Sequence, residues 1–303
     1  MLFIVQYLKD YFRTIAIWRL VITLLLTAAL IAANYLWQIE KLIRNLPSRI
    51  VSFLLFLMLY LLIYGSAFFV QAFRNKEWKL TNRKSFFLIF LLAPCFFALK
   101  MIHWSGGIAL QSTAWTKYLT IILQWPLKLL ALLLFLRAAK NYGGEESLRA
   151  FRKHFPVKPY FLLLLMMVPL ILFASTRPDF LQSYPKLQQV YFINNISAYQ
   201  WPLYILFEIC YGSDFISIEL FFRGLLVIGI AKYVGKEAIL PMAVFYCSIH
   251  FGKPLLECIS SFAGGLILGI LSYGSRSIGG GLMIHLGIAF LMEICGYLGH
   301  LFI

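Results

Sequence analysis

Four ionisable residues near the C-terminus have types and spacings that suit hydrolytic chemistry. Glu219 and Arg223 are four residues apart, so a helix would place both on one face. His250 and His285 follow in two further apolar segments. A carboxylate and two imidazoles from separate helices are the groups that activate a water molecule and polarise a carbonyl. The simpler interpretation of the first two residues is a structural ion pair.

The segments that carry these residues are apolar enough to lie in a membrane. The chain is 61% hydrophobic and 13% charged, unlike a soluble domain. A charged side chain at mid-bilayer costs about 2.5–3.5 kcal/mol on insertion scales, so such residues usually face a cavity or one another. The four residues are therefore expected to gather in one polar site.

Apolar runs of spanning length recur along the whole chain. They cover residues 20–37, 50–73, 86–102, 118–136, 160–174, 201–230, 255–273 and 278–298. The segment 201–230 is either one long span or a broken one, and the shorter run 238–250 is either a span or a buried or re-entrant helix. The predicted fold is an all-α, polytopic membrane helix bundle with eight or nine transmembrane helices.

The net charge of +15 is explained by membrane topology, so no nucleic-acid partner is expected. Basic residues cluster in the segments between spans, where an excess of Lys and Arg marks cytoplasmic loops. The clusters comprise Lys9, Arg13 and Arg19; Arg74, Lys76, Lys79, Arg83 and Lys84; and Arg137, Lys140, Arg149, Arg152, Lys153 and Lys158. This pattern predicts a cytoplasmic N-terminus, and the short loops favour a prokaryotic inner (plasma) membrane.

Two regions of different character are expected. Residues 1–155 form a four-helix membrane region with few internal charges, and residues 156–303 carry the polar-bearing helices. Gly265 and Gly269 have the GxxxG spacing that lets membrane helices approach closely. The five cysteines follow no metal or disulfide pattern and are interpreted as packing residues. Asn195–Ser197 is a formal glycosylation sequon, interpreted as chance.

The order of the polar motifs resembles the CPBP family, which comprises CAAX prenyl endopeptidases and bacteriocin-processing or immunity proteins, also called Abi. The family pattern is Glu-Glu-x-x-x-Arg, then Phe-x-x-x-His, then His-x-x-x-Asn/Asp, each in its own membrane helix. Here Glu219-Leu-Phe-Phe-Arg223 matches the second Glu and the Arg of the first motif, and Tyr246-Cys-Ser-Ile-His250 matches the second motif with Tyr for Phe. The third motif is matched only at its His, by His285. The resemblance covers roughly residues 160–300.

The resemblance implies an intramembrane peptidase. Its first Glu and second-motif His activate the attacking water, and its third-motif His and Asn stabilise the oxyanion. This chain departs at two of these positions, where Ile218 replaces the first Glu and Ala289 replaces the Asn. Isoleucine cannot take a proton, so the family mechanism does not carry over intact.

Helical spacing suggests where replacement acids come from. Asp214 lies four residues before Ile218, and Glu293 lies four residues after Ala289. Each is thus displaced by one turn, about 6 Å, along the same face. The hypothesis is that Asp214 or Glu219 serves as base and that a protonated Glu293 completes the far wall of the site.

Three alternatives remain open at this stage. The chain could be a catalytically inactive CPBP-like membrane scaffold or partner-binding protein, because two motif positions are substituted. Glu219, His250 and His285 could instead bind zinc, since His₂Glu is a catalytic zinc set, although no His-Glu-x-x-His motif is present. A transporter would be expected to show internal repeats, which are absent. For the peptidase, the expected substrate is a membrane-embedded or lipidated peptide or protein within the bilayer.

Overall fold

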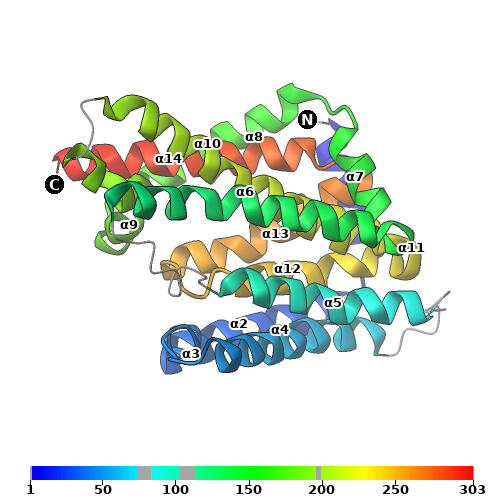
Figure 1. Ribbon diagram of the computed structural model, residues 1–303. Coiled ribbons are helices and arrows are strands. Elements are labelled where there is room, and N and C mark those ends of the chain that lie inside the picture. The colour runs from blue at the N-terminus through cyan, green and yellow to red at the C-terminus, as the bar shows by residue number, and fades with distance from the viewer. Residues whose placement is uncertain (1, 74–82, 103–112, 196–198, 303) are drawn as a thin grey trace. The chain divides into compact units, whose positions relative to one another are not determined.

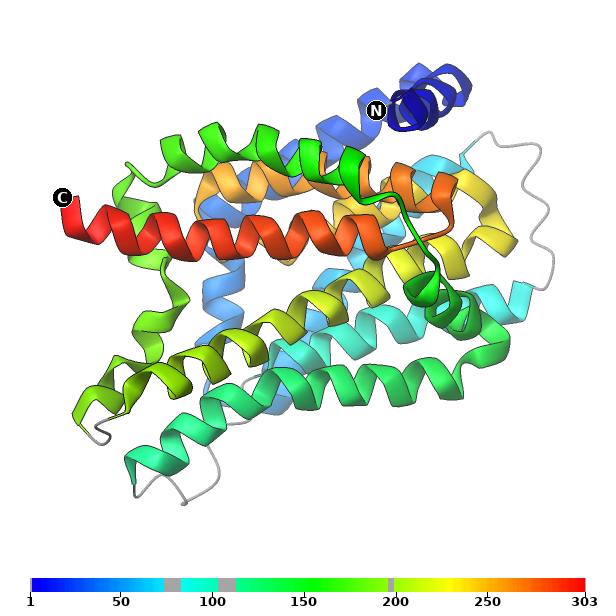
Figure 2. The same cartoon turned by 90° about the horizontal axis from the view of Figure 1, so that it is seen from above.

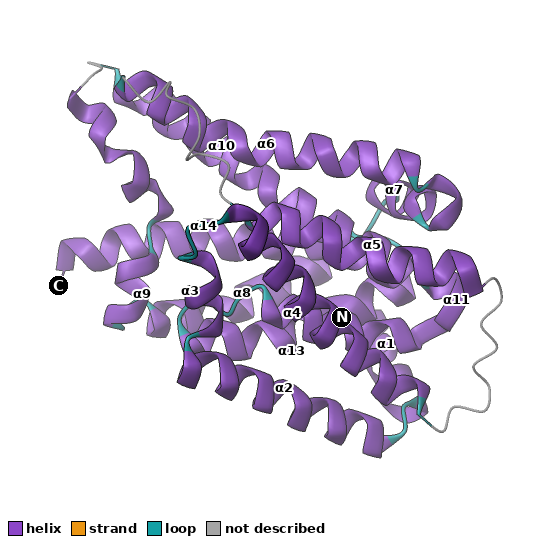
Figure 3. Ribbon diagram, turned by 60° about the horizontal axis from the view of Figure 1, so that its bottom comes forward, coloured by secondary structure: helices purple, strands orange, loops and turns teal. Residues whose placement is uncertain are grey.

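The computed structural model describes residues 2–73, 83–102, 113–195 and 199–302. Helices joined by short loops make up these residues, and no strand occurs among them (Figure 3). The predicted all-α, polytopic membrane fold is therefore confirmed. Arg74, Lys76 and Lys79 of the second basic cluster, and most of the sequon at 195–197, lie outside the described residues.

Seven of the described helices are long and apolar enough to cross a membrane. They are α2 (Ile17–Trp37), α4 (Arg49–Ala72), α5 (Arg83–Met101), α6 (Ala114–Ala138), α8 (Val157–Ala174), α13 (Leu255–Ser275) and α14 (Gly279–Phe302). The expected total of eight or nine stays a prediction. Helix α10 (Gln200–Glu219) is not among the seven, since Glu208, Asp214 and Glu219 lower its hydropathy. Helix α12 (Ile239–Ser248) has only ten residues.

The chain forms two compact units, and each is described by itself. Unit 1 comprises residues 1–103, 136–153 and 221–278, and unit 2 comprises residues 104–135, 154–220 and 279–303. Both units draw on distant parts of the sequence. The expected functional boundary at residue 155 stays a prediction.

Helix α12 is the centre of unit 1, and all ten of its residues are buried. It packs against α2, α4 and α13, and α4 also packs against α2 and α5 (Figure 1). An added Cβ at Gly265 would lie 2.9 Å from the Tyr246 ring, and one at Gly269 would lie 2.6 Å from Met242. These glycines therefore let α13 approach α12, as the GxxxG spacing predicts. The run 238–250 is a buried helix.

Aromatic rings fill the interior of unit 1. The rings of Phe97, Phe222 and Phe245 lie within 6 Å of one another, measured between centroids. Helix α7 (Gly144–Arg152) closes one side, because Gly143 meets the backbone of Gly229 so closely that neither position has room for a Cβ. Helix α1 (Leu2–Thr14) packs on α13. The segment that follows Glu219, residues 220–230, is buried throughout in this packing.

Unit 2 is built around α14, which lies beside α8 (Figure 2). Helix α10, the short helix α9 (Pro178–Ser183) and the 3-10 segment η3 (Lys186–Asn195) complete it. Helix α10 packs on both α14 and η3. The core of the unit consists of Tyr118, Ile122, Trp125, Val190, Ile193, Phe207, Cys210 and Tyr211. This core fixes α10, the helix that carries Glu219, and α10 in turn packs on α14, the helix that carries His285.

One further sequence prediction is confirmed. All five cysteines are free, and four of them are buried, as expected for packing residues. Glu145 lies in the first turn of α7 and forms an ion pair with Arg149 one turn later. The remaining short elements are α3 (Ile39–Arg44), η2 (Lys140–Tyr142), η4 (Leu220–Gly229), α11 (Ala231–Val234) and η5 (Gly235–Ala238).

Candidate catalytic residues

Glu219 and His285 form a hydrogen-bonded pair within unit 2. The Nδ1 atom of His285 lies 2.9 Å from Oε1 of Glu219. Glu219 is fully buried at the end of α10, and the His285 side chain is 12% exposed. A carboxylate can only accept here, so an ionised Glu219 receives the Nδ1 proton of His285. The structure thus joins two of the residues that the sequence analysis selected.

The imidazole of His285 is held from a second side. The Phe215 ring lies 4.8 Å from the imidazole centroid at 76°, an edge-to-face contact. Phe215 is four residues before Glu219 on α10, so one face of this helix supplies both contacts. His285 lies six residues after Gly279, about 9 Å along α14. The sequence analysis missed Phe215, because an aromatic residue in an apolar run gives no signal of such a role.

The chain changes its helical form directly after Glu219. Residues 220–229, η4, are π-helical, and the amide of Ile230 donates to the carbonyl of Leu225, five residues earlier. Such π segments are rare and occur frequently at functional sites. The segment contains Arg223, so the first motif spans the transition from α-helix to π-helix. A period of 3.6 residues, used for the sequence prediction, does not describe this part of the motif.

In unit 1, Tyr246 connects Arg223 to His250. The guanidinium carbon of the fully buried Arg223 lies 4.1 Å from the centroid of the Tyr246 ring. The His250 imidazole lies edge-to-face against the same ring at 4.8 Å. The residue that replaces the family Phe therefore contacts both Arg223 and His250, the two motif residues of its unit.

The tautomer of a neutral His250 follows from one hydrogen bond. Its Nδ1 atom lies 3.0 Å from the backbone carbonyl oxygen of Tyr246. A carbonyl only accepts, so Nδ1 carries the proton and Nε2 carries the lone pair. This arrangement suits His250 for accepting a proton at Nε2.

Replacing Tyr246 by Leu is expected to lower the free energy of unfolding by about 2 kcal/mol, the value of a desolvated cation–π contact. Replacing it by Phe retains the ring and is expected to have little effect. Chemical denaturation of both purified variants measures the difference. Equal stability of the Leu and Phe variants would contradict a role for the ring in holding Arg223.

Glu293 receives two backbone hydrogen bonds in unit 2. The amide of Lys186 donates to its Oε1 at 2.8 Å, and the amide of Leu187 donates to its Oε2 at 3.2 Å. These amides start η3, and their N–H groups have no partner within the helix. Glu293 therefore caps η3. Its expected place in a catalytic wall stays a prediction.

Replacing Glu293 by Ala is expected to lower the free energy of unfolding by about 0.5–2 kcal/mol, as for other lost helix caps. The reason is that two amides lose their acceptor. Thermal unfolding of the variant, compared with Glu293→Gln, measures this cost, since the Gln side chain retains one acceptor oxygen. If the Ala variant unfolds at the wild-type temperature but loses peptidase activity, Glu293 is catalytic rather than structural.

The other positions of the relocation hypothesis lie on the expected helices. Asp214 is half-buried on α10, one helical turn before Ile218. Ala289 is buried on α14, one turn after His285 and one turn before Glu293. The spacing that the hypothesis requires is therefore present, and the catalytic use of Asp214 stays a prediction.

Within the described ranges, no group of three His, Cys, Asp or Glu side chains is arranged to hold a metal ion. The pair in unit 2 supplies one imidazole and one carboxylate, whereas catalytic zinc sites have three protein ligands. The zinc alternative stays a prediction, and metal analysis of chelator-washed protein tests it.

Residues 198–291 match the profile of the family described as type II CAAX prenyl endopeptidase, Rce1-like. No curated protein and no solved structure shows a significant match. The matched range contains Glu219, Arg223, His250 and His285 and ends before Glu293. The family is one of proteases, which agrees with the membrane helices and the polar motifs. Over residues 198–291 the chain is therefore similar to the Rce1-like type II CAAX prenyl endopeptidases, which are part of the CPBP/Abi family.

Proposed function

We propose that the protein is an intramembrane endopeptidase in which Glu219 and His285 act together on the attacking water. The observation that carries this proposal is their 2.9 Å hydrogen bond. It lies inside the range matched by the protease family and between two residues of the family motifs. The pair is also buried, and electrostatic interactions are stronger in a water-poor environment.

The pair supplies the two proton transfers that peptide hydrolysis requires. Glu219 accepts from Nδ1, which leaves the lone pair of His285 on Nε2. This nitrogen takes a proton from water as the oxygen attacks the peptide carbonyl carbon, and the ionised carboxylate stabilises the imidazolium that forms. When the carbon–nitrogen bond breaks, the same proton passes to the leaving nitrogen. Glu219 thus takes the part that the family gives to the Glu replaced by Ile218.

His250 enters the proposal through the family motif. Its lone pair at Nε2, fixed by the bond from Nδ1 to Tyr246, suits a group that accepts a hydrogen bond from water. The proposal needs no metal ion or other cofactor. Asp214 remains a second candidate for the base, because it lies one turn from the substituted motif position.

The substrate class follows from the family and from the surroundings of the pair. The matched family is described by its action on prenylated CAAX proteins, and both dyad residues belong to helices of a membrane bundle. We therefore propose a lipidated or membrane-embedded peptide as substrate. The N-terminus is proposed to be cytoplasmic in a prokaryotic inner membrane, in agreement with the distribution of basic residues.

The test is cleavage of lipidated and unlipidated reporter peptides by the purified protein in lipid nanodiscs. Wild type is expected to cleave the lipidated peptide, with product formation followed by mass spectrometry. If the protein binds the reporter peptides but cleaves none of them, the result would support the inactive scaffold instead.

A further inference from the structure

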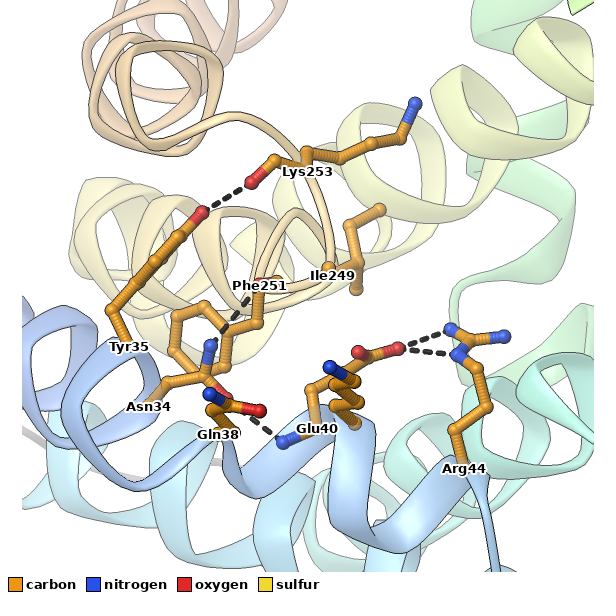
Figure 4. Close-up of a pocket in the computed structure, with 10 residues that line it drawn as sticks. Asn34, Tyr35, Gln38, Glu40, Arg44, Ile249, Phe251 and Lys253 are labelled. Atoms are coloured by element: carbon orange, nitrogen blue, oxygen red, sulfur yellow. Dashed lines mark hydrogen bonds and ion pairs between the residues drawn. The ribbon is translucent and has the colours of Figure 1, made fainter. Parts of the chain in front are cut away.

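A polar pocket of about 500 Å³ lies entirely within unit 1. One wall comes from the end of α2 and from α3, and the other comes from four residues that flank His250, namely Ile249, Phe251, Gly252 and Lys253 (Figure 4). None of the proposed proton transfers uses this pocket. Its lining is polar on both sides, which raises the question of what it binds.

The walls of the pocket are tied together by hydrogen bonds. Asn34 donates from Nδ2 to the carbonyl of Phe251 at 3.1 Å, and Tyr35 donates to the carbonyl of Lys253 at 2.6 Å (Figure 4). Asn34 also accepts from the amide of Glu40 at 2.9 Å. The segment after His250 is thereby fixed to α2 and α3. These hydrogen bonds between its walls give the pocket a defined shape.

Positive charge prevails among the described lining residues. Lys41, Arg44 and Lys253 carry cations, and Glu40 carries the one acid of the lining. The buried Glu40 orients Arg44, whose Nε donates to its Oε1 at 2.6 Å. Lys253 also pairs with Glu257, whose Oε1 lies 3.5 Å from its Nζ. The three cations of the lining still outnumber these two carboxylates, so the pocket favours an anionic ligand.

The pocket adjoins a surface that faces lipid. Leu36 and Trp37, at the end of the membrane-spanning helix α2, are 77% and 67% exposed. Trp at the end of a span marks the boundary between the hydrocarbon and the headgroups. A basic pocket between helices at this depth is suited to a lipid headgroup.

The turn at the base of the pocket adopts an unusual backbone conformation. Gln38 lies between α2 and α3 with φ of 50° and lines the pocket. Non-glycine residues in this region cost free energy and are concentrated at binding and catalytic sites. The strained turn brings Glu40 and Arg44 beside the segment that follows His250.

We propose that this pocket binds the phosphate of an anionic phospholipid headgroup. Lys41, Arg44 and Lys253 surround the phosphate, and the lipid chains lie along the exposed apolar end of α2. The bound headgroup holds residues 249–253 against α3 and so steadies His250. The effect on catalysis rests on the proposed function, whereas lipid binding is measured independently of peptidase activity.

The experiment is native mass spectrometry of the purified protein titrated with phosphatidylglycerol and, separately, with phosphatidylcholine. Tighter binding of phosphatidylglycerol is expected. Each cation near a headgroup changes affinity about fivefold, so Lys41→Gln/Lys253→Gln is expected to weaken phosphatidylglycerol binding about 25-fold. The matched control Lys9→Gln/Arg13→Gln removes two exposed cations of α1, away from the pocket, and is expected to bind like wild type.

A second variant changes the pocket without changing its charge. An added Cβ at Gly252 would lie 2.8 Å from Oε2 of Glu40, so Gly252→Ala is expected to displace Glu40 and Arg44 and to weaken phosphatidylglycerol binding. The Glu219→Gln variant, altered in unit 2, is expected to bind the lipid normally even if it is inactive. This separates failure of the lipid site from failure of the peptidase.

Three results would overturn the proposal. The first is equal affinity for the two lipids. The second is equal affinity of the pocket and control double variants for phosphatidylglycerol. The third is that the pocket substitutions leave the binding of both lipids unchanged but weaken the binding of a peptide. That result would assign the pocket to a peptide carboxylate. Matching thermal unfolding curves for all variants confirm that each is folded.

Discussion

Glu219→Gln is expected to reduce kcat for a lipidated reporter peptide by about 10²–10⁴-fold, the range for loss of general acid–base catalysis. The amide has nearly the same shape as the carboxylate, so Phe215 and the helix packing are retained. Gln cannot stabilise the imidazolium of His285 by charge, and this is the function that the hydrogen bond assigns to Glu219. Steady-state kinetics in nanodiscs measure the effect.

Glu208→Gln is the matched control for this prediction. Glu208 lies on the same helix α10 and is half-buried, but it lies outside the motifs and outside the proposed pair. It is expected to retain kcat within a few-fold of wild type. If the two variants are equally active, Glu219 is not catalytic. If only an Asp214→Asn variant is inactive, the base is Asp214.

His250→Ala is expected to abolish cleavage, with a loss of about 10²–10⁴-fold in kcat. The variant loses the imidazole whose Nδ1 is hydrogen-bonded to the Tyr246 carbonyl and whose Nε2 is proposed to accept a hydrogen bond from water. The exposed His154→Ala variant, changed at a histidine outside the motifs, is expected to be fully active. The same kinetic assay compares the two variants.

His250→Ala also separates the peptidase from the inactive scaffold. A scaffold would retain partner binding in this variant and would show no cleavage in either form. Wild-type cleavage that persists in His250→Ala would remove His250 from the mechanism. Unfolding curves that match wild type are required, because His250 also contacts the Tyr246 ring.

The sequence was sufficient to predict the helices and most of the membrane spans. Apolar runs of spanning length and sparse charge are local properties, and seven of these runs are helices long and apolar enough to cross a membrane. The GxxxG spacing predicted the approach of α13 to α12, because only the absence of a side chain permits it. The motif residues Glu219 and His285 were selected from their rarity in apolar segments, and they are hydrogen-bonded.

What the sequence did not show depends on contacts between distant residues. Lys186 and Leu187 are more than 100 positions from Glu293, which caps them, so the acid was interpreted only by its spacing from Ala289. The π-helical form of residues 220–229 departs from the period of 3.6 residues that the sequence prediction assumed, and Gly229 at its end lies against the backbone of Gly143. The role of Tyr246 was hidden because its substitution for Phe preserves the ring that Arg223 contacts.

The most direct test of the Glu219–His285 pair is a double-mutant cycle on peptidase activity. It compares Glu219→Gln, His285→Gln and the combined variant with wild type, using kcat/KM for one lipidated peptide. Residues that act as a unit show strongly non-additive losses. The kcat/KM of the combined variant is therefore expected to be no lower than that of the less active single variant. Losses that multiply would show that the two residues act independently and would contradict the proposed dyad.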